Sequence, residues 1–147
     1  MYELKYIKSA DKQAKADDLA DTAADFVQRV WNLKPDAIVP VPPSNNRAMQ
    51  PVALVVNGLS ARLGVPVCND CLAKIKQTPQ LKDIKDYDRR REVLRDAFQA
   101  KPEHCKGRNL LLFDDLHGSG ATTGHIVDVL KAAGAKAVHL LTLTTKK

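Results

Sequence analysis

The segment from Leu110 to Thr123, LLLFDDLHGSGATT, constrains the fold more than any other part of the chain. It opens with four apolar residues in a row, which is typical of a strand buried on both faces in a parallel sheet. Two carboxylates, Asp114 and Asp115, end this run, and a Gly-Ser-Gly loop follows. A helix is expected to begin near Thr122, with Gly134 placed to end it. A strand, a glycine loop and a helix start predict an anion site, because loop amides and the helix dipole both favour phosphate.

The two carboxylates narrow the kind of anion that this site would hold. Because carboxylates repel phosphate, a pair of them beside a phosphate loop suggests a ligand with hydroxyl groups, or a metal ion, next to its phosphate. A ribose 5-phosphate fits, with its phosphate on 118–122 and its hydroxyls on Asp114 and Asp115. The loop is neither a Walker A loop, since it has no Gly-Lys-Ser/Thr, nor a dinucleotide-binding GxGxxG. The competing interpretation is an ordinary strand–turn–helix whose aspartates cap the helix.

Strands and helices are predicted to alternate along the rest of the chain. In addition to the elements above, we expect helices over 10–31 and 49–63, a helical turn over 88–94, and strands over 2–7, 36–41, 65–68 and 137–144. Trp31 is expected in the core, and 77–88 is predicted to be a mobile loop because it has many charges and little apolar anchorage. This alternation predicts one α/β domain, 1–147, with a mainly parallel central sheet flanked by helices.

The carboxyl ends of the strands are where parallel sheets of this kind bind ligands. The segment with Pro43, Ser44 and Arg47 follows one strand, as the glycine loop follows another, so the two could face one site. A rigid proline turn with free amides and an arginine suits a diphosphate, because arginine binds phosphate oxygens through two parallel hydrogen bonds. Taken alone, the segment is a generic proline-rich turn, and its position is what indicates a second phosphate site.

Composition and charge exclude several classes of protein. No apolar run has the length of a membrane span, and the N-terminus lacks the apolar core of a signal peptide, so we expect a cytoplasmic protein that does not act at a membrane. The net charge is +6, and eight basic residues lie between positions 74 and 95. This cluster indicates a polyanionic ligand, nucleic acid or simply a solvated surface. Aromatic residues make up only 5% of the chain, so a base-stacking platform is poorly supported.

Three cysteines, an odd and sparse set, do not form a disulfide framework. We expect Cys68 and Cys71, a lone CxxC near a strand end, to be cysteines that bind no metal. Zinc would need two further ligands, for which His104 and Cys105 are the only candidates. Thioredoxin-like redox chemistry is not expected, because no helix N-terminus is evident beside the pair.

The segment 110–123 closely resembles the 5-phosphoribosyl-1-pyrophosphate (PRPP) binding motif of type I phosphoribosyltransferases. That motif has hydrophobic residues, two acidic residues and a small-residue loop that ends Gly-x-Thr, here Gly120-Ala121-Thr122. The rest of the chain is similar to the ComF-like branch of that family. The segments that carry this wider resemblance are Leu4-Lys5-Tyr6, Val39-Pro40-Val41-Pro42, Thr78-Pro79-Gln80, and Arg89-Arg90-Arg91 up to Ala97-Phe98.

The resemblance implies a type I phosphoribosyltransferase fold and an enzyme that binds PRPP with Mg²⁺. Such an enzyme transfers the phosphoribosyl group to a nitrogen nucleophile and releases pyrophosphate. Asp114, Asp115 and Arg90 are the implied catalytic residues, and the two aspartates would hold the metal indirectly, through ribose hydroxyls or water. The implied 5-phosphate site is Gly118, Ser119, Gly120, Ala121 and Thr122, and the implied pyrophosphate site is Pro43, Ser44, Arg47, Lys74 and Lys76.

Two other functions remain open at this stage. One is a PRPP or nucleotide sensor that transfers nothing; Gly118 favours it, because hypoxanthine-type enzymes have an aspartate there that assists the purine. The other is an accessory protein in DNA uptake or processing, suggested by the net charge and the ComF-like resemblance. The acceptor cannot be read from the sequence, although His117 lies beside the site and is a candidate contact for it. A homodimer is the expected assembly.

Overall fold

A three-stranded parallel sheet forms the centre of the molecule. The computed structural model describes residues 9–42, 49–76, 83–117 and 120–145. The strands lie in the order β1–β4–β5, with β1 Ala37–Pro40, β4 Asn109–His117 and β5 Ala137–Thr145. All the pairings are parallel, which confirms the predicted sheet type. Because β4 is the middle strand, the apolar run of the motif is buried on both faces, as predicted from its sequence.

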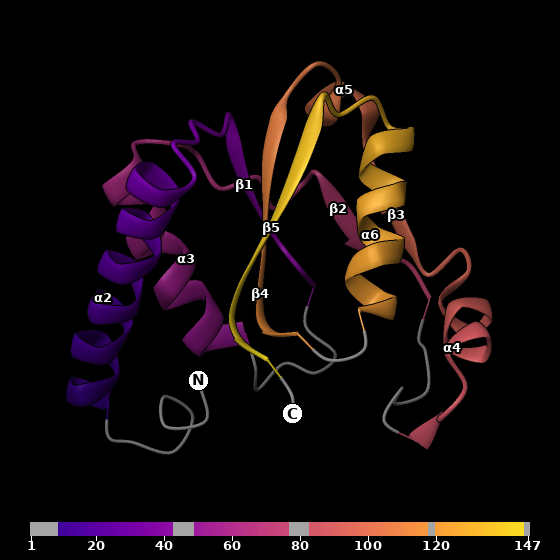
Figure 1. Cartoon of the computed structure of the whole chain (residues 1–147), viewed down its shortest axis with the longest axis horizontal. Coiled ribbons are helices and arrows are strands. Elements are labelled where there is room, and N and C mark those ends of the chain that lie inside the picture. The colour runs from indigo at the N-terminus through magenta and orange to yellow at the C-terminus, as the bar shows by residue number, and fades with distance from the viewer. Residues whose placement is uncertain (1–8, 43–48, 77–82, 118–119, 146–147) are drawn as a thin grey trace.

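Two helices, α2 (Ser9–Asp25) and α3 (Met49–Leu63), cover one face of the sheet (Figure 1). A π-helical turn, η1 (Phe26–Val30), continues α2. The helices pack closely where they cross, since a Cβ added at Gly58 would lie 2.9 Å from the Cβ of Ala20. The core between these helices and the sheet includes Ala16, Val27, Val55 and Leu59 from the helices and Ile38, Leu111 and Phe113 from the strands.

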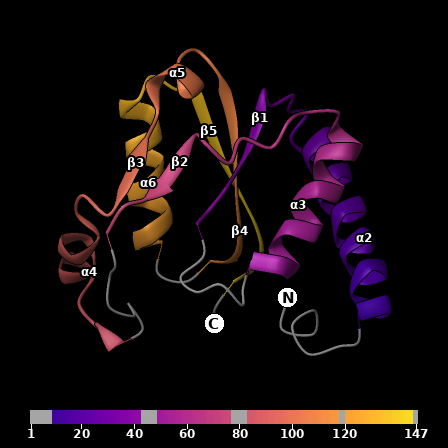
Figure 2. The same cartoon turned by 180° about the vertical axis from the view of Figure 1, so that it is seen from behind.

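The opposite face of the sheet is covered by α6 (Ala121–Ala132) and a small second sheet. That sheet pairs β2 (Leu72–Lys74) with β3 (Phe98–Ala100) in antiparallel register. Helix α4 (Tyr87–Leu94) packs against α6, and a short helix, α5 (Pro102–Cys105), leads into β4. Figure 2, seen from behind, shows the same division, with α2 and α3 on one side of β4 and α6 with the small sheet on the other.

Most of the long predicted elements are confirmed, whereas two predictions are wrong and two short strands were missed. Residues 65–68 do not form a strand; a single parallel bridge joins Ile38 to Val67, in a stretch where Pro66 lacks a backbone N–H. The strands β2 and β3 were not predicted. Trp31 is 37% exposed rather than in the core, because the π-helical turn before it changes the direction of the side chains that follow. The predicted strand 2–7 and residues 77–82 of the predicted loop lie outside the described residues.

Cys68 and Cys71 form a disulfide, a bond that was not predicted for the CxxC. The turn between them brings their Cα atoms to 5.4 Å, within the range that a disulfide requires. Cys105 is a free thiol that is buried beneath the small sheet, and its Sγ lies 3.8 Å from the carbonyl oxygen of Cys71. In the described part of the chain, none of the helices combines the length and apolar composition that a membrane span needs.

Candidate active site

The carboxyl ends of β1 and β4 and the start of α6 lie at the same edge of the sheet (Figure 1). The amide of Val41 donates to the carbonyl of Phe113 at 2.8 Å, so the chain leaving β1 runs beside the residue that precedes Asp114. The structure therefore brings the start of the proline segment next to the carboxylate end of the motif. Pro43, Ser44 and Arg47, predicted to bind pyrophosphate, lie outside the described residues.

Asp114 lies inside β4 rather than after it, which corrects the predicted end of this strand. The strand continues to His117 because β5 runs beside it, pairing Asp114 with Thr142 and Leu116 with Thr144. Asp114 is half-buried, and strand alternation places it on the face of Leu110 and Leu112, which α6 covers. The side chains of Asp115 and His117 lie outside the described residues, although their backbone belongs to the strand.

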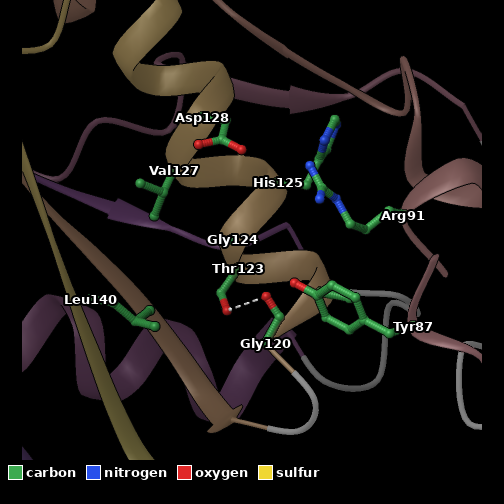
Figure 3. A pocket seen from close by; sticks show the side chains of 10 residues that line it. Tyr87, Arg91, Gly120, Thr123, Gly124, His125, Val127, Asp128 and Leu140 are labelled. Atoms are coloured by element: carbon green, nitrogen blue, oxygen red, sulfur yellow. Dashed lines mark hydrogen bonds between the residues drawn. The ribbon is translucent and has the colours of Figure 1, made fainter.

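Gly120 forms the junction between the loop and α6. Its φ of 81° and ψ of −2° lie in the left-handed region, which glycine adopts at little cost. Its carbonyl accepts from the amide of Gly124 at 2.8 Å and from the hydroxyl of Thr123 at 3.4 Å (Figure 3). The first turn of a helix has N–H groups without helical partners, so this junction has the geometry of an anion site.

The other residues predicted for the 5-phosphate differ in how much of them is accessible. Ala121 is buried and Thr122 is half-buried, and both belong to the first turn of α6. Gly118 and Ser119 lie outside the described residues. Thr123 was not predicted as a site residue. Its buried hydroxyl bonds to the carbonyl of Gly120 and so closes the first turn of α6. Its position three residues after a glycine was the sequence signal for this contact.

The basic residues predicted for the site lie in elements that pack beside α6. Lys74 is half-buried in β2, and Lys76 is exposed just after it. On α4, the Nε of Arg90 donates to the carbonyl of Ile84 at 2.5 Å, which fastens the start of that helix to the segment before it. Arg90 therefore has a structural partner in addition to any role with a ligand.

A shallow groove of about 430 Å³ runs between α4 and α6, next to Gly120 (Figure 3). Tyr87 and Arg91 of α4 form one wall, and residues of α6 with Leu140 of β5 form the rest. No described residue of β1 or β4 lines the groove, but Gly120 and Ala121, predicted for the 5-phosphate, lie at one end of it. Sequence reasoning missed the groove; the only available signal was the spacing of Tyr87 and Arg91, which places them on one helix face.

The described residues contain no cluster of three or more His, Cys, Asp or Glu side chains that could hold a metal ion by itself. Two of the four side chains considered for zinc, Cys68 and Cys71, are joined in a disulfide. Mg²⁺ prefers oxygen ligands and is commonly held by one or two carboxylates together with substrate phosphates and water. The carboxylate of Asp114 at the sheet edge fits that mode of binding, in which the protein supplies only one or two of the ligands.

No protein-family model and no curated protein matches this sequence. Solved structures do match it. They include the glutamine PRPP amidotransferase of B. subtilis, at 21% identity and a TM-score of 0.60 over 88% of this chain and 26% of that one. They also include the purine phosphoribosyltransferase of Pyrococcus horikoshii Ot3, at 19% identity and a TM-score of 0.55 over 88% of this chain and 71% of that one. The adenine phosphoribosyltransferase of Saccharomyces cerevisiae matches at 16% identity and a TM-score of 0.56, over 87% of this chain and 66% of that one.

These likenesses confirm the predicted fold. The chain has the fold of type I phosphoribosyltransferases, with a parallel sheet flanked by helices and the carboxylate motif on the middle strand. It spans only about a quarter of the length of the B. subtilis amidotransferase. The ComF-like branch that the sequence resembles stays a prediction.

Proposed function

We propose that this chain is a phosphoribosyltransferase that binds PRPP with Mg²⁺ at the carboxyl edge of its sheet. One observation carries the proposal: the middle strand of a phosphoribosyltransferase fold carries Asp114, and the same edge holds the left-handed Gly120 at the start of α6. Carboxylates for hydroxyl groups and a helix start for phosphate are the two features that a ribose 5-phosphate needs.

The 5-phosphate would bind at the start of α6. Gly118 to Thr122 would supply backbone amides, because the positive end of the helix dipole and the loop N–H groups both favour an anion. Gly120 lets the backbone approach the phosphate without a Cβ in the way. The phosphate would thus fix one end of the substrate and orient the sugar along the sheet edge.

The ribose would lie over the end of β4. Asp114 and Asp115 would accept hydrogen bonds from its 2- and 3-hydroxyls and would stabilise the positive charge that develops on the sugar in the transition state. The bond between C1 and the pyrophosphate oxygen breaks, and the pyrophosphate leaves with the electron pair. A nitrogen nucleophile forms the new bond to C1 and gives its proton to the surrounding water.

Pyrophosphate would be held by the proline segment and by basic residues. Pro43, Ser44 and Arg47 would supply amides and a guanidinium, and Lys74, Lys76 and Arg90 would add positive charge and limit the access of water to C1. Mg²⁺, held by Asp114 and Asp115 through water or hydroxyls, would neutralise charge on the pyrophosphate. Exclusion of water matters because a sugar with positive charge at C1 is easily hydrolysed.

Calorimetric titration with PRPP, with and without Mg²⁺, tests this proposal first. We expect PRPP to bind in the presence of Mg²⁺ and to bind at least tenfold more weakly without it. Ribose 5-phosphate and pyrophosphate should each bind more weakly than PRPP, since each occupies only part of the site. Absence of PRPP binding would refute the proposal.

A PRPP or nucleotide sensor is the second candidate, and it is favoured by Gly118, which has no side chain for acid–base chemistry. A sensor would bind PRPP as tightly as an enzyme does but would release no pyrophosphate. A screen of nitrogen acceptors, such as nucleobases and ammonia, with a coupled pyrophosphate assay separates the two. Turnover with any acceptor would establish the enzyme, whereas PRPP binding without turnover across the screen would favour the sensor.

A further inference from the structure

The groove between α4 and α6 presents charged groups of opposite sign. Arg91 extends from α4 toward α6, and Asp128 lies on α6 two turns after Gly120 (Figure 3). Both side chains are exposed, and neither has an ion pair or a side-chain hydrogen bond within the described part of the chain. An unpaired cation and an unpaired anion lining one groove can bind a ligand that carries both an anionic group and N–H donors.

A third polar group in the groove also lacks a partner. The Nε2 of His125 is buried and makes no hydrogen bond with any described residue, although buried polar atoms are nearly always satisfied. His125 lines the groove and lies 6.1 Å from the ring of Phe98, centroid to centroid, so its ring has an apolar backing.

The shape of the groove favours a flat ligand. Tyr87 is 48% exposed, and its ring forms one wall, with its hydroxyl directed toward the first turn of α6 (Figure 3). Gly124 is exposed on the α6 side, and a Cβ built there meets no atom within 4 Å, so the backbone of the helix is open to a ligand at this point. The volume of about 430 Å³ falls in the range that small-molecule sites occupy.

We propose that this groove is a second binding site, for a nucleoside monophosphate. The base would lie against Tyr87, the phosphate would pair with Arg91, and an N–H group of the base would donate to Asp128. A free amino acid such as aspartate also carries an anionic group and N–H donors, but it has no ring for Tyr87 and would fill little of the groove. The groove reaches Gly120 and Ala121, but Tyr87, Arg91 and Asp128, which would hold the nucleotide, are not among the residues proposed to bind PRPP.

Calorimetry with AMP and with adenosine, in the presence of saturating ribose 5-phosphate, tests the proposal. Ribose 5-phosphate occupies the sheet edge, so the remaining AMP binding reports the groove. We expect AMP to bind at least tenfold more tightly than adenosine. In Arg91→Gln this preference should disappear because the phosphate loses its partner, whereas Arg95→Gln, an exposed arginine just beyond α4, should keep it.

A steric variant provides a second, independent test. Gly124→Leu would fill the groove, and since nothing lies near the added Cβ and glycine is a poor helix former, its thermal midpoint should not fall below that of the wild type. We expect it to weaken AMP binding at least tenfold, whereas Ala132→Leu, exposed at the other end of α6, should bind AMP normally.

Three results would overturn the second site. AMP could fail to bind once ribose 5-phosphate is saturating, which would place it at the sheet edge. Arg91→Gln and Gly124→Leu could both bind AMP like the wild type. Finally, a free amino acid such as aspartate could bind while AMP does not, which would keep the groove but refute the nucleotide.

Discussion

Gly120 and Gly124 lie one helical turn apart but have opposite conformational requirements. Gly120 has a left-handed backbone at the junction between loop and helix, whereas Gly124 lies within α6, with nothing near an added Cβ. A side chain at the first position would therefore strain the backbone that is proposed to hold the 5-phosphate. A side chain at the second would remove the entropic cost of a glycine in a helix.

Gly120→Ala should weaken PRPP binding at least tenfold and lower the free energy of unfolding by about 1–2 kcal/mol, the cost of left-handed backbone for a residue with a Cβ. Gly124→Ala is the matched control. It should bind PRPP normally and raise the free energy of unfolding by up to about 1 kcal/mol. Titration calorimetry and urea unfolding of both variants measure these effects. Equal PRPP affinities would show that the junction does not contact the phosphate.

The double variant Asp114→Asn, Asp115→Asn should reduce kcat by about 100-fold or more, because amides cannot stabilise positive charge on the sugar as carboxylates do. Its unfolding free energy should stay close to that of the wild type, since asparagine keeps the shape of aspartate. Pyrophosphate release and urea unfolding measure the two effects.

Asp36→Asn is the control for that double variant. The carboxylate of Asp36 accepts from the amide of Asn109 at 2.7 Å, at the opposite end of β4, so its loss should affect stability and leave turnover unchanged. Full activity in the double variant would refute the proposal that Asp114 and Asp115 bind the ribose hydroxyls.

Cys105 should be unreactive in the native protein. Burial raises the pKa of its thiol. Two nearby charges have smaller effects: Arg108 lowers the pKa, and Glu103 raises it. Because the native pKa is above the unfolded one, this contribution to stability is complete below the unfolded pKa of about 8.5 and is lost as the pH rises through the native pKa.

Thiol titration with a coloured disulfide reagent checks both Cys105 and the disulfide. We expect almost no reaction in the native state, one thiol in denaturant, and three thiols in denaturant after reduction. Alkaline pH should lower the unfolding midpoint in urea, and Cys105→Ala should reduce that dependence. Three reactive thiols in denaturant without reduction would contradict the Cys68–Cys71 bond.

At the scale of the helices and strands, two properties decided which predictions succeeded: the length of the element, and the separation in sequence between the residues that pair. The helices α3 and α6 and the strand β5 are long enough for apolar spacing and glycine signals to define them. The strands β2 and β3 have three residues each and exist because Leu72 pairs with Ala100, which no local pattern indicates. Likewise, β4 passes beyond Asp114 because β5 extends beside it.

In the candidate site, too, only the features set by neighbouring residues in the sequence could be predicted. The motif itself indicated Asp114 and the start of α6, since their order along the chain is local information. The groove could not be predicted, because it is created by the packing of α4 against α6, and the sequence does not specify which faces of two helices meet. The same holds for Trp31, whose exposure follows from the π-helical turn before it.

Gly58→Val should lower the free energy of unfolding by about 1–3 kcal/mol, the usual cost of overpacking. The added side chain would force α3 away from α2, since its Cβ would lie 2.9 Å from that of Ala20. Ala53→Val, an exposed position on the same helix, is the control and should change stability by less than about 1 kcal/mol. Urea unfolding measures both. If the two variants were equally stable, the helices would not cross as closely as described.

At the scale of the whole molecule, the net charge of +6 does not gather on α4 and its flanks. The segment 83–96 has equal numbers of the two charge types: five basic residues, Lys85, Arg89, Arg90, Arg91 and Arg95, and five acidic residues, Asp83, Asp86, Asp88, Glu92 and Asp96. A surface with alternating charge repels phosphates as often as it attracts them. The excess of basic residues between 74 and 95 therefore comes mainly from Lys74, Lys76 and Lys82, which lie before α4 and are too few for tight binding to nucleic acid.

Duplex DNA should therefore bind no more tightly than the non-specific range, with a dissociation constant of about 10⁻⁵ M or weaker at physiological salt. Fluorescence anisotropy of a labelled duplex at about 50 and 200 mM salt measures this, and the higher salt should abolish what binding there is. Submicromolar binding that persists at the higher salt would favour the accessory role in DNA processing over the phosphoribosyltransferase.

The middle position of β4 links the activity of the protein to its global unfolding. Leu110, Leu111 and Leu112 are fully inaccessible and are paired with a strand on each side, so their amides should exchange with deuterium only when the whole molecule opens. Asp114 belongs to the same strand. Partial opening at the edges would leave its backbone in place, and heat should abolish PRPP binding only when the last protected amides are lost.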